Sequence, residues 1–366
     1  MLEEDLLYVL ALQRAKGIGD INAKKLISHC GSARNVLKEK KQILQKINGI
    51  GASTIRHLFD KDNLTAAEIE LKYIQKNKVE TFYFEDKKYP ERLKHCIDAP
   101  ILMFKEGNFN LNKKPIISIV GTRNITSYGR DFCERLISDL KSYNPIIVSG
   151  FAYGVDIFAH KAALKNELQT IAVLAHGFEE MYPKSHKKYV AEINKNGGFI
   201  TDFWHNDALQ RENFLKRNRI VAGISEATII IESAEKGGSL VTADIANSYS
   251  RDVFAVPGRN TDNFSKGCND LIKRNKAAIL TSANDLVEML NWDLETKETI
   301  VQKQLFVELD ATEQMVYNFL LKEGKELLDI ISLNCKLPVY KTVTVLFNLE
   351  MKGVVKPLPG KMYEAI

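Results

Sequence analysis

Two apolar runs in the middle of the chain, residues 116–120 and 145–148, stop abruptly at residues that could hold a phosphate group. Glycine lets a backbone and a ligand approach closely, and arginine supplies a permanent cation with a planar fork of donors. Short apolar runs closed by glycine are typical of buried parallel strands, and ligands bind outside the carboxyl ends of such strands. We therefore predict phosphate contacts from the residues that follow the two runs, which are Gly121, Thr122, Arg123, Ser149 and Gly150.

A third candidate follows the apolar run 228–231, where two glycines open a helix-like stretch. Amide groups at a helix N-terminus, together with the helix dipole, hold anions, and nearby hydroxyl groups can donate to the same anion. A glycine pair that simply begins a capped helix is an equally good interpretation. The candidate residues are Gly237, Gly238, Ser239 and Thr242.

The segment 214–219 points most directly to nucleic acid, because it places cations beside an aromatic ring, Phe214. Cations neutralise phosphates, and an aromatic face can stack on an unpaired base for about 1–3 kcal/mol. The alternative is a charged helix face in solvent, with Phe214 in the core. The candidates besides Phe214 are Lys216, Arg217, Asn218 and Arg219, with Lys184 in a neighbouring loop.

Patterns for catalysis or for a bound cofactor are not evident in the sequence. Neither G-x-G-x-x-G nor G-x-x-x-x-G-K-[ST] follows the first strand, which counts against nicotinamide dinucleotides and P-loop ATP hydrolysis. Asp156 and His160 have the i, i+4 spacing of an acid–base pair or of metal ligands, but a third ligand is missing. We interpret these two residues as members of a structural hydrogen-bond network. The sequence thus predicts no catalytic residue, no metal and no cofactor.

Strand-like and helix-like stretches alternate from about residue 115 to residue 291, which predicts an α/β fold with a doubly wound, mainly parallel sheet. Such a sheet brings the carboxyl ends of several strands to one edge, where the candidate residues would meet. The predicted strands are 116–120, 146–149, 170–175, 198–203, 228–232, 252–256 and 277–281. The predicted helices are 127–142, 153–166, 185–196, 213–223, 238–250, 267–274 and 283–290.

The first 60 residues contain a repeat, because residues 16–26 align with residues 48–58 and each copy begins with a Gly-Ile-Gly turn before an apolar-periodic stretch. The repeat resembles the tandem form of the helix-hairpin-helix family, in which such amides hold a phosphate without reading bases. Residues 10–57 carry ten Lys and Arg against two acidic residues, a local excess of +8 that favours a polyanion. A helical packing domain whose glycines only cap helices is the alternative. The auxiliary phosphate contacts would be Gly17, Gly19, Lys24, Lys25, Gly49, Gly51 and Arg56.

The C-terminal region is predicted to be a winged helix, with three helices and a hairpin pattern at 353–363. Its third helix offers no arginine for base contacts, and residues 308–366 hold seven Lys against eight acidic residues. We interpret it as a protein-interaction module, with DNA reading as the alternative. The predicted helices are 311–322, 325–334 and 338–351. The predicted domains are 1–65, 66–291 with its leading connector, the polar linker 292–306, and 307–366.

Length and composition fit two or three globular domains, with 366 residues of which 45% are hydrophobic. No apolar run approaches the roughly 18 residues needed to cross a bilayer, and the first residues are acidic where a signal peptide is basic. The five cysteines show no C-x-x-C spacing and are interpreted as reduced thiols. We therefore expect a cytoplasmic protein without a membrane span.

The motifs of the central region resemble, in order and over about residues 85–290, those of the DNA-processing protein A family (DprA, also called Smf). Departures from the family pattern are Leu215, where proline is common, and Val155, in place of the usual isoleucine. The matching motifs are Val120-Gly121-Thr122-Arg123, Ser149-Gly150-x-Ala152-x-Gly154, Phe214-x-x-Arg217-Asn218-Arg219 and Lys236-Gly237-x-Ser239-x-x-Thr242.

The resemblance implies an extended Rossmann-like domain between a helix-hairpin-helix (SAM-like) domain and a winged helix, in a cytoplasmic homodimer. It implies a protein without catalysis that binds single-stranded DNA, protects incoming DNA in natural transformation and loads the recombinase RecA onto it. The alternative is a nucleotide-processing hydrolase of the lysine-decarboxylase-like (LOG) group, but residues 235–244 lack that group's proline and its second G-T step. The family's DNA contacts would fall on Arg123 and its loop, Lys184, Phe214, Arg217, Asn218 and Arg219.

Overall fold

In the computed structural model, residues 3–292, 309–358 and 361–365 are described. The chain divides into two compact units, Met1–Leu294 and Glu295–Ile366. Each unit has its own buried apolar core. The predicted linker 292–306 lies outside the described residues from 293 onward.

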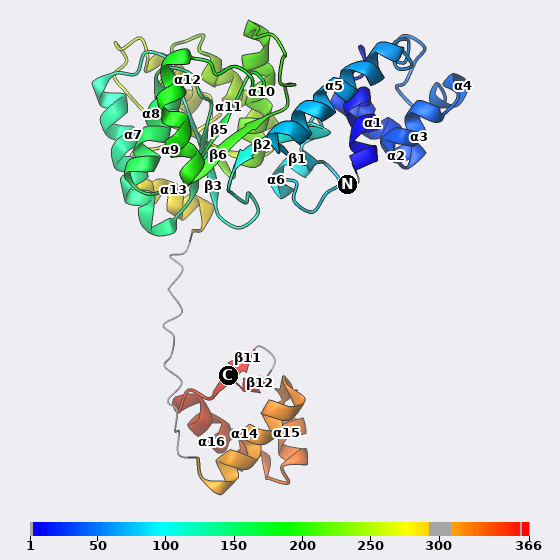
Figure 1. Cartoon of the computed structure of the whole chain (residues 1–366). Coiled ribbons are helices and arrows are strands. Elements are labelled where there is room, and N and C mark those ends of the chain that lie inside the picture. Colours follow the sequence, from blue (N-terminus) through cyan, green and yellow to red (C-terminus); the bar gives the residue numbers. More distant parts are fainter. Residues whose placement is uncertain (1–2, 293–308, 359–360, 366) are drawn as a thin grey trace. The chain divides into compact units, whose positions relative to one another are not determined.

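Among the described residues of the first unit, nine strands form one sheet in the order β1-β2-β6-β5-β4-β3-β7-β8-β9 (Figure 1). The pairs β1–β2 and β2–β6 are antiparallel, and the remaining pairs are parallel, so the predicted mainly parallel α/β fold is confirmed. All seven predicted strands form. In the connector, residues 98–104 predict a strand that leads into the sheet, and β2 forms there, whereas the sequence does not predict β1. The strands are β1 (Glu80–Tyr83), β2 (Leu102–Gly107), β3 (Ile116–Val120), β4 (Ile146–Ser149), β5 (Thr170–Val173), β6 (Gly197–Thr201), β7 (Ala227–Ile230), β8 (Asp252–Ala255) and β9 (Ala278–Ile279).

Helices cover both faces of this sheet, because alternate residues of each strand point to opposite sides. In β3, Ile117 and Ile119 join a core with helices α7, α8 and α13, while Ile116 and Val120 join a core with α10, α11 and α12 (Figure 1). The helices that surround the parallel strands are α6 (Glu91–Lys94), α7 (Ser127–Asp139), α8 (Val155–Lys165), α9 (Val190–Lys195), α10 (Arg211–Ile224), α11 (Gly238–Ser248), α12 (Lys266–Lys273) and α13 (Ala283–Leu290), with 3₁₀ turns η1 (Leu140–Tyr143) and η2 (Lys184–Tyr189).

The strand order reverses its direction between β3 and β7. From β3 the chain moves through β4 and β5 to β6 on one side, and then returns to place β7, β8 and β9 on the other. In open α/β sheets a crevice forms outside the carboxyl ends of the strands at such a switch point. The ends of β3 and β7 are therefore where a ligand site is expected.

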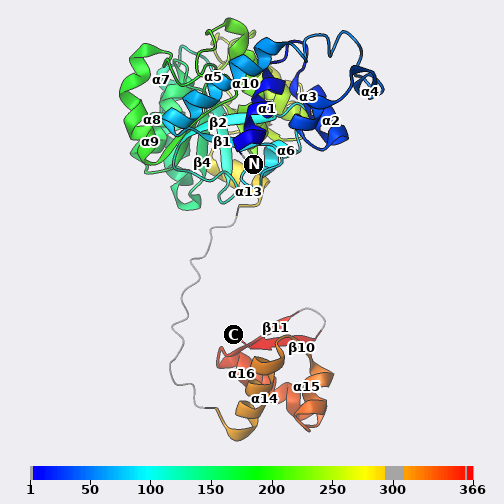
Figure 2. The same ribbon diagram turned by 45° about the vertical axis from the view of Figure 1, so that its right-hand side comes forward.

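A layer of helices precedes the sheet and packs on its β1–β2 edge (Figure 2). Its core joins Leu10, Leu26 and Ile55 to Phe104 of β2. The first Gly-Ile-Gly turn precedes a helix as predicted, but the second is followed by successive turns over 52–59, which corrects the expected second helix. The predicted boundary at 65 falls inside α5, and the helix-hairpin-helix assignment stays a prediction. The helices are α1 (Glu3–Arg14), α2 (Asp20–Cys30), α3 (Ala33–Lys38), α4 (Lys41–Leu44) and α5 (Lys61–Asn77).

In its described residues, the second unit has three helices and a C-terminal hairpin near the predicted positions, but residues 326–327, inside the predicted helix 325–334, form a short strand, and the helix begins at 328. Its first helix begins with a capping box, in which the side chain of Asp310 accepts from the Glu313 amide and the side chain of Glu313 accepts from the Asp310 amide. The winged-helix assignment itself stays a prediction. The elements are α14 (Ala311–Glu323), α15 (Leu328–Asn334), α16 (Val339–Met351) and an antiparallel sheet β10-β12-β11 of Glu326–Leu327, Met362–Ala365 and Val355–Leu358.

No single helix in the described ranges has the length and apolar composition to cross a membrane. One bent pair, α15 with α16, meets both criteria when the two helices are taken together.

Candidate nucleic-acid interface

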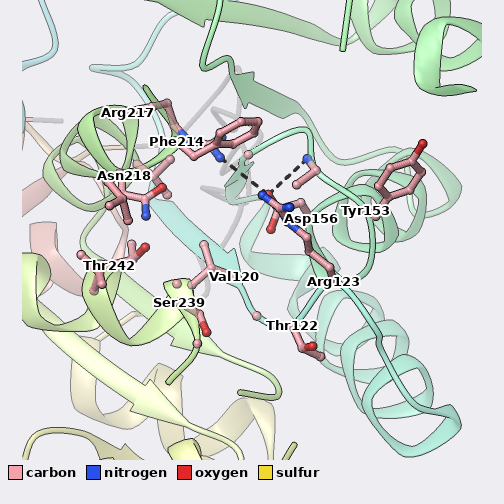
Figure 3. Close-up of a pocket in the computed structure, with 18 of the residues that line it drawn as sticks. Val120, Thr122, Arg123, Tyr153, Asp156, Phe214, Arg217, Asn218, Ser239 and Thr242 are labelled. Carbon is pink, nitrogen blue, oxygen red and sulfur yellow. Dashed lines mark hydrogen bonds and ion pairs between the residues drawn. The ribbon is translucent and has the colours of Figure 1, made fainter. Parts of the chain in front are cut away.

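A cavity of about 720 Å³ opens at the carboxyl ends of β3, β4 and β7, at the switch point of the sheet (Figure 3). Its walls come from the loops after these strands, from successive turns of α10 and from the start of α11. Residues far apart in the sequence therefore meet there, as the α/β pattern predicts. The candidate residues that line it are Gly121, Thr122, Arg123, Gly150, Phe214, Arg217, Asn218, Gly237, Gly238, Ser239 and Thr242.

The loop after β3 is held in place by Glu232, the second residue after β7. The Thr122 amide donates to the Glu232 carbonyl oxygen at 2.7 Å, and the Thr126 amide donates to the Glu232 carboxylate at 2.9 Å. The Thr126 hydroxyl donates to the other carboxylate oxygen at 2.5 Å. Because Glu232 is 3% exposed, these bonds are shielded from water. The loop that carries Arg123 is thus fixed before any ligand arrives.

Two glycines allow the loops after β3 and β4 to pack against each other. Gly154 has φ +78°, and a Cβ atom there would overlap the Thr122 carbonyl oxygen. A Cβ atom at Gly121 would lie 2.5 Å from Cγ2 of Val155. Both glycines are therefore needed for packing inside the protein, Gly154 against the backbone of Thr122 and Gly121 against the side chain of Val155. The contact of Gly121 with a ligand stays a prediction.

Under the cavity lies a buried charged pair, Arg217 and Asp156. The Arg217 guanidinium lies 3.9 Å from the Asp156 carboxylate and also donates to the Val173 carbonyl oxygen. Asp156 accepts a bond of 3.3 Å from the Ala152 amide. Burial raises the pKa of Asp156 and lowers the pKa of Arg217 from their ordinary values. Arg217 therefore supports the floor of the cavity. Because the side chain is buried and paired with Asp156, only part of its guanidinium is available for the predicted phosphate contact.

Arg123 lies over the ring of Phe214, with 5.2 Å between its Cζ atom and the ring centroid. In the described part of the chain, Arg123 has no carboxylate partner and is exposed. Phe214 is half-buried, and the ring of Tyr182 meets it edge-on at 6.1 Å. The cation and the aromatic ring that were predicted separately thus form one surface at the mouth of the cavity (Figure 3).

The first turn of α11 closes another side of the cavity. Gly238 is exposed, and a Cβ atom there would meet no atom within 4 Å. The Ser239 hydroxyl donates to the Ser233 hydroxyl at 2.8 Å, and the side chain of Thr242 is buried. The helix start is therefore open to a ligand, while the hydroxyl groups mainly serve the protein itself.

The exposed residues of the cavity wall that were not selected from the sequence include one aromatic residue, Tyr153, and two cations, Arg211 and Lys236. Arg211 lies three positions before Phe214 on α10, so helical spacing could have placed it on the same face. Lys236 directly precedes the glycine pair. With Arg123, these residues give the wall three exposed cations, and its one carboxylate is the buried Asp156.

Comparisons with known proteins agree on one family. The family model described as DNA recombination-mediator protein A matches residues 80–291, which include the entire cavity wall. The chain belongs to this family. The matched region excludes the N-terminal glycine turns and the second unit.

Relatives of the family extend the match beyond the central region. The chain is 37% identical over 210 residues to the DNA processing protein DprA of Streptococcus pneumoniae, which covers 57% of this chain and 74% of that protein. It is 30% identical over 295 residues to Protein Smf of Synechocystis, which covers 79% of this chain and 74% of that protein.

Two solved structures of the family are similar to this chain. The X-ray structure of DprA from Streptococcus pneumoniae aligns with a TM-score of 0.65 and 30% identity, over 79% of this chain and 98% of that chain. A Helicobacter pylori DprA, whose structure concerns its single-stranded DNA binding mode, aligns with a TM-score of 0.53 and 27% identity. The latter match covers 58% of this chain and 96% of that chain.

Within the family region, four predicted contacts lie outside the cavity. Ser149 is buried and donates to the Ile119 carbonyl oxygen at 2.6 Å. Lys184 lines a separate hollow beside Tyr182. Lys216 and Arg219 face another hollow, because positions 214, 217 and 218 share one side of α10 and positions 216 and 219 lie on the other.

Arg219 forms ion pairs inside the protein and is not a free cation at the surface. Its guanidinium forms ion pairs with Asp202 at 2.6 Å and with Asp20 at 3.0 Å, and it donates to the Asp98 carbonyl oxygen. Burial opposes its charge, but the carboxylates of Asp202 and Asp20 raise the pKa of Arg219 above its ordinary value. Since Asp20 begins α2, the tie joins the N-terminal helices to the sheet. We therefore leave Arg219 out of the proposed DNA contacts.

The two N-terminal glycine turns pack against each other. A Cβ atom at Gly17 would lie 3.3 Å from the Thr54 carbonyl oxygen, and Lys25 donates to the Asn48 carbonyl oxygen at 3.4 Å. Lys24 donates to two carbonyl oxygens at 3.5 Å, and burial lowers its pKa. The exposed auxiliary candidates are Gly17, Gly19, Lys25, Gly49, Gly51 and Arg56, whose contact with DNA stays a prediction.

His160 has the structural hydrogen-bonding role that we predicted for it in place of a catalytic or metal-binding role. Its Nδ1 atom lies 2.7 Å from the Thr170 hydroxyl and its Nε2 atom lies 2.6 Å from the Gly150 carbonyl oxygen. Burial lowers the pKa of His160 to about 4. Among the residues that the structure describes, no group of three or more His, Cys, Asp or Glu could hold a metal ion.

Proposed function

We propose that the chain binds single-stranded DNA in the cavity at the switch point. The observation that carries this proposal is the mouth of the cavity, where Arg123 lies over Phe214 with the exposed cations Arg211 and Lys236 on the same wall. Cations hold phosphates, and an aromatic face can stack on unpaired bases. The Helicobacter pylori relative is described by its single-stranded DNA binding mode.

The biological role that follows is that of a recombination mediator in the cytoplasm. The protein would protect incoming DNA during natural transformation and load the recombinase RecA onto the strand, as a homodimer and without catalysis. The family description as a recombination mediator supports this role. The second unit would bind a protein partner, because its third helix lacks arginine.

A nucleotide-processing hydrolase of the lysine-decarboxylase-like (LOG) group is the weaker candidate. By its family pattern, that group needs a catalytic arrangement of Arg and Glu. The single carboxylate of the cavity wall is Asp156, which is buried and pairs with Arg217. No observation favours this second function.

Fluorescence anisotropy with labelled single-stranded and duplex oligonucleotides over a salt series tests the binding proposal. We expect tighter binding of the single strand and an affinity that falls steeply as salt rises. Arg123→Glu should remove most of the binding, whereas Arg135→Glu, an exposed charge on α7, should change it little. Equal binding by the Arg123 variant and the parent would contradict the assigned site.

The mediator role needs its own measurement. RecA-dependent strand exchange on protein-covered single strands should start sooner when the chain is added, and light scattering should give the mass of a dimer. If the protein binds single strands tightly but leaves strand exchange unchanged, the binding proposal stands and the mediator proposal is contradicted.

A further inference from the structure

A hollow of about 670 Å³, different from those of Lys184 and of Lys216 with Arg219, lies beside the cavity. It shares Arg123 and Tyr153 with the cavity. It is bounded by the start of α7, by α8 and by η2, and we call it the side groove. The residues of the side groove that carry the argument are Arg123, Arg130, Tyr153, Lys161, Lys188 and Tyr189.

The side groove is strongly cationic. Arg123, Arg130, Lys161 and Lys188 line it, all four are exposed, and none of its lining residues is Asp or Glu. In the described ranges none of the four cations has an ion-pair partner, although other exposed cations such as Lys165 do. Four like charges in one hollow repel each other, so a polyanion that neutralises them would be attracted there.

Aromatic rings alternate with these cations. Lys161 lies 6.0 Å from the Tyr189 ring centroid, and Lys188 lies 5.1 Å from the same ring. Tyr153 is 48% exposed, and its orientation is fixed by the Ser185 hydroxyl at 3.2 Å and by the His186 ring at 4.9 Å. Flat rings between cations suit a strand with unpaired bases better than they suit a duplex or a free phosphate.

We propose that the DNA strand does not end in the cavity but continues past Arg123 and Tyr153 into the side groove. In Figure 3 these two residues lie on the opposite side of the cavity from Asn218 and Thr242, so they form the exit toward the side groove. The inference rests on the proposed function and extends it. The cavity holds a short segment of the strand, and the side groove binds the segment that follows.

Oligonucleotide length separates the two surfaces. Oligothymidines of about 5 and about 15 nucleotides should probe the cavity alone and the cavity with the side groove, respectively. The groove variant is Lys161→Ala with Lys188→Ala in the full chain. The matched control is Lys72→Ala with Lys76→Ala, which removes two exposed charges from α5. Thermal unfolding should be alike in all three proteins, because the replaced side chains are exposed.

We expect the groove variant to bind the long oligonucleotide roughly tenfold more weakly, with unchanged affinity for the short one. The slope of log affinity against log salt should fall by about 1.4 for the long strand, since each phosphate contact contributes about 0.7. The control should match the parent at both lengths.

Two results would overturn the inference while leaving strand binding in the cavity intact. One is an unchanged affinity of the groove variant at both lengths. The other is an equal loss at both lengths, which would mean that the two lysines act only through the general field of the protein. If the parent binds neither oligonucleotide, the proposed function itself fails and the inference with it.

Discussion

The guanidinium of Arg219 lies 2.6 Å from the carboxylate of Asp202, and the same group pairs with Asp20 of the N-terminal helices. Arg219 stands in a motif that suggests phosphate contact, but its ion pairs connect the N-terminal helices to the segment that follows β6. Both partners are nearly buried, with side chains 16% and 8% exposed. Removing one member of a buried pair leaves the other charge without compensation.

Arg219→Ala should therefore lower the free energy of unfolding by about 3–5 kcal/mol, measured by urea denaturation. Its affinity for a single strand, measured well below the unfolding transition, should equal that of the parent. Lys216→Ala is the neighbouring exposed control and should leave stability unchanged. A stable Arg219 variant with weakened strand binding would restore the original interpretation as a DNA contact.

Gly150 and Gly238 line the same cavity but should respond differently to alanine. A Cβ atom at Gly150 would overlap the guanidinium of Arg217 and the carboxylate of Asp156, whereas at Gly238 it would meet nothing within 4 Å. Gly150→Ala should cost about 1–3 kcal/mol of stability by overpacking, and Gly238→Ala should be neutral or slightly stabilising in the first turn of α11. Calorimetry of both variants checks this contrast, and equal melting temperatures would contradict it.

The strands and helices around the cavity were predictable because their periodicity is strong. Four of the five residues of β3 are apolar, the fifth is Ser118, and the strand lies between a polar segment and a glycine, a pattern with few other interpretations. The alternation of Ile116 and Ile117 between two cores then follows from strand geometry. The switch point, and with it the place of the cavity, follows from strand order, which sequence spacing does not encode.

The sequence does not predict which lysines and arginines lack an ion-pair partner in the folded protein. Arg217 and Arg219 are two positions apart on α10, so they point to different sides and meet different carboxylates. Asp202 and Asp20 are distant in sequence, and only the folded chain brings them to Arg219. The sequence does not place Arg211 on this surface because the predicted helix begins at 213, two residues after the start of α10.

Phe214 should contribute to strand binding through its ring. Phe214→Leu keeps an apolar side chain but removes the aromatic face, so we expect a loss of about 1–3 kcal/mol in binding free energy for single strands. Duplex binding should change less, because paired bases are not free to stack. Titration by anisotropy with both ligands measures the difference. An equal loss for the two ligands would mean that Phe214 serves only to position Arg123.

Deleting residues 307–366 should leave single-strand affinity largely unchanged, because every residue of the cavity wall belongs to the first unit. The deleted segment also carries a charge of −1 by count of Lys and acidic residues over 308–366, so the deletion removes little attraction for DNA. Anisotropy with the truncated and full chains makes the comparison. A large loss of affinity would assign DNA contact to the second unit.

His160 should make stability depend on pH between about 6.5 and 4. Burial holds its folded pKa at about 4, below the ordinary histidine value of about 6.5. Above the unfolded pKa both states are neutral and the full stability is present. As pH falls the unfolded chain takes up a proton first, so stability is lost progressively until the folded pKa is reached, by up to about 3 kcal/mol.

His160→Gln should lose this contribution to the slope of stability against pH, whereas His29→Gln, on the exposed side of α2, should keep it. Urea denaturation of the three proteins at several pH values measures the slopes, and identical slopes for His160→Gln and the parent would refute the buried neutral imidazole.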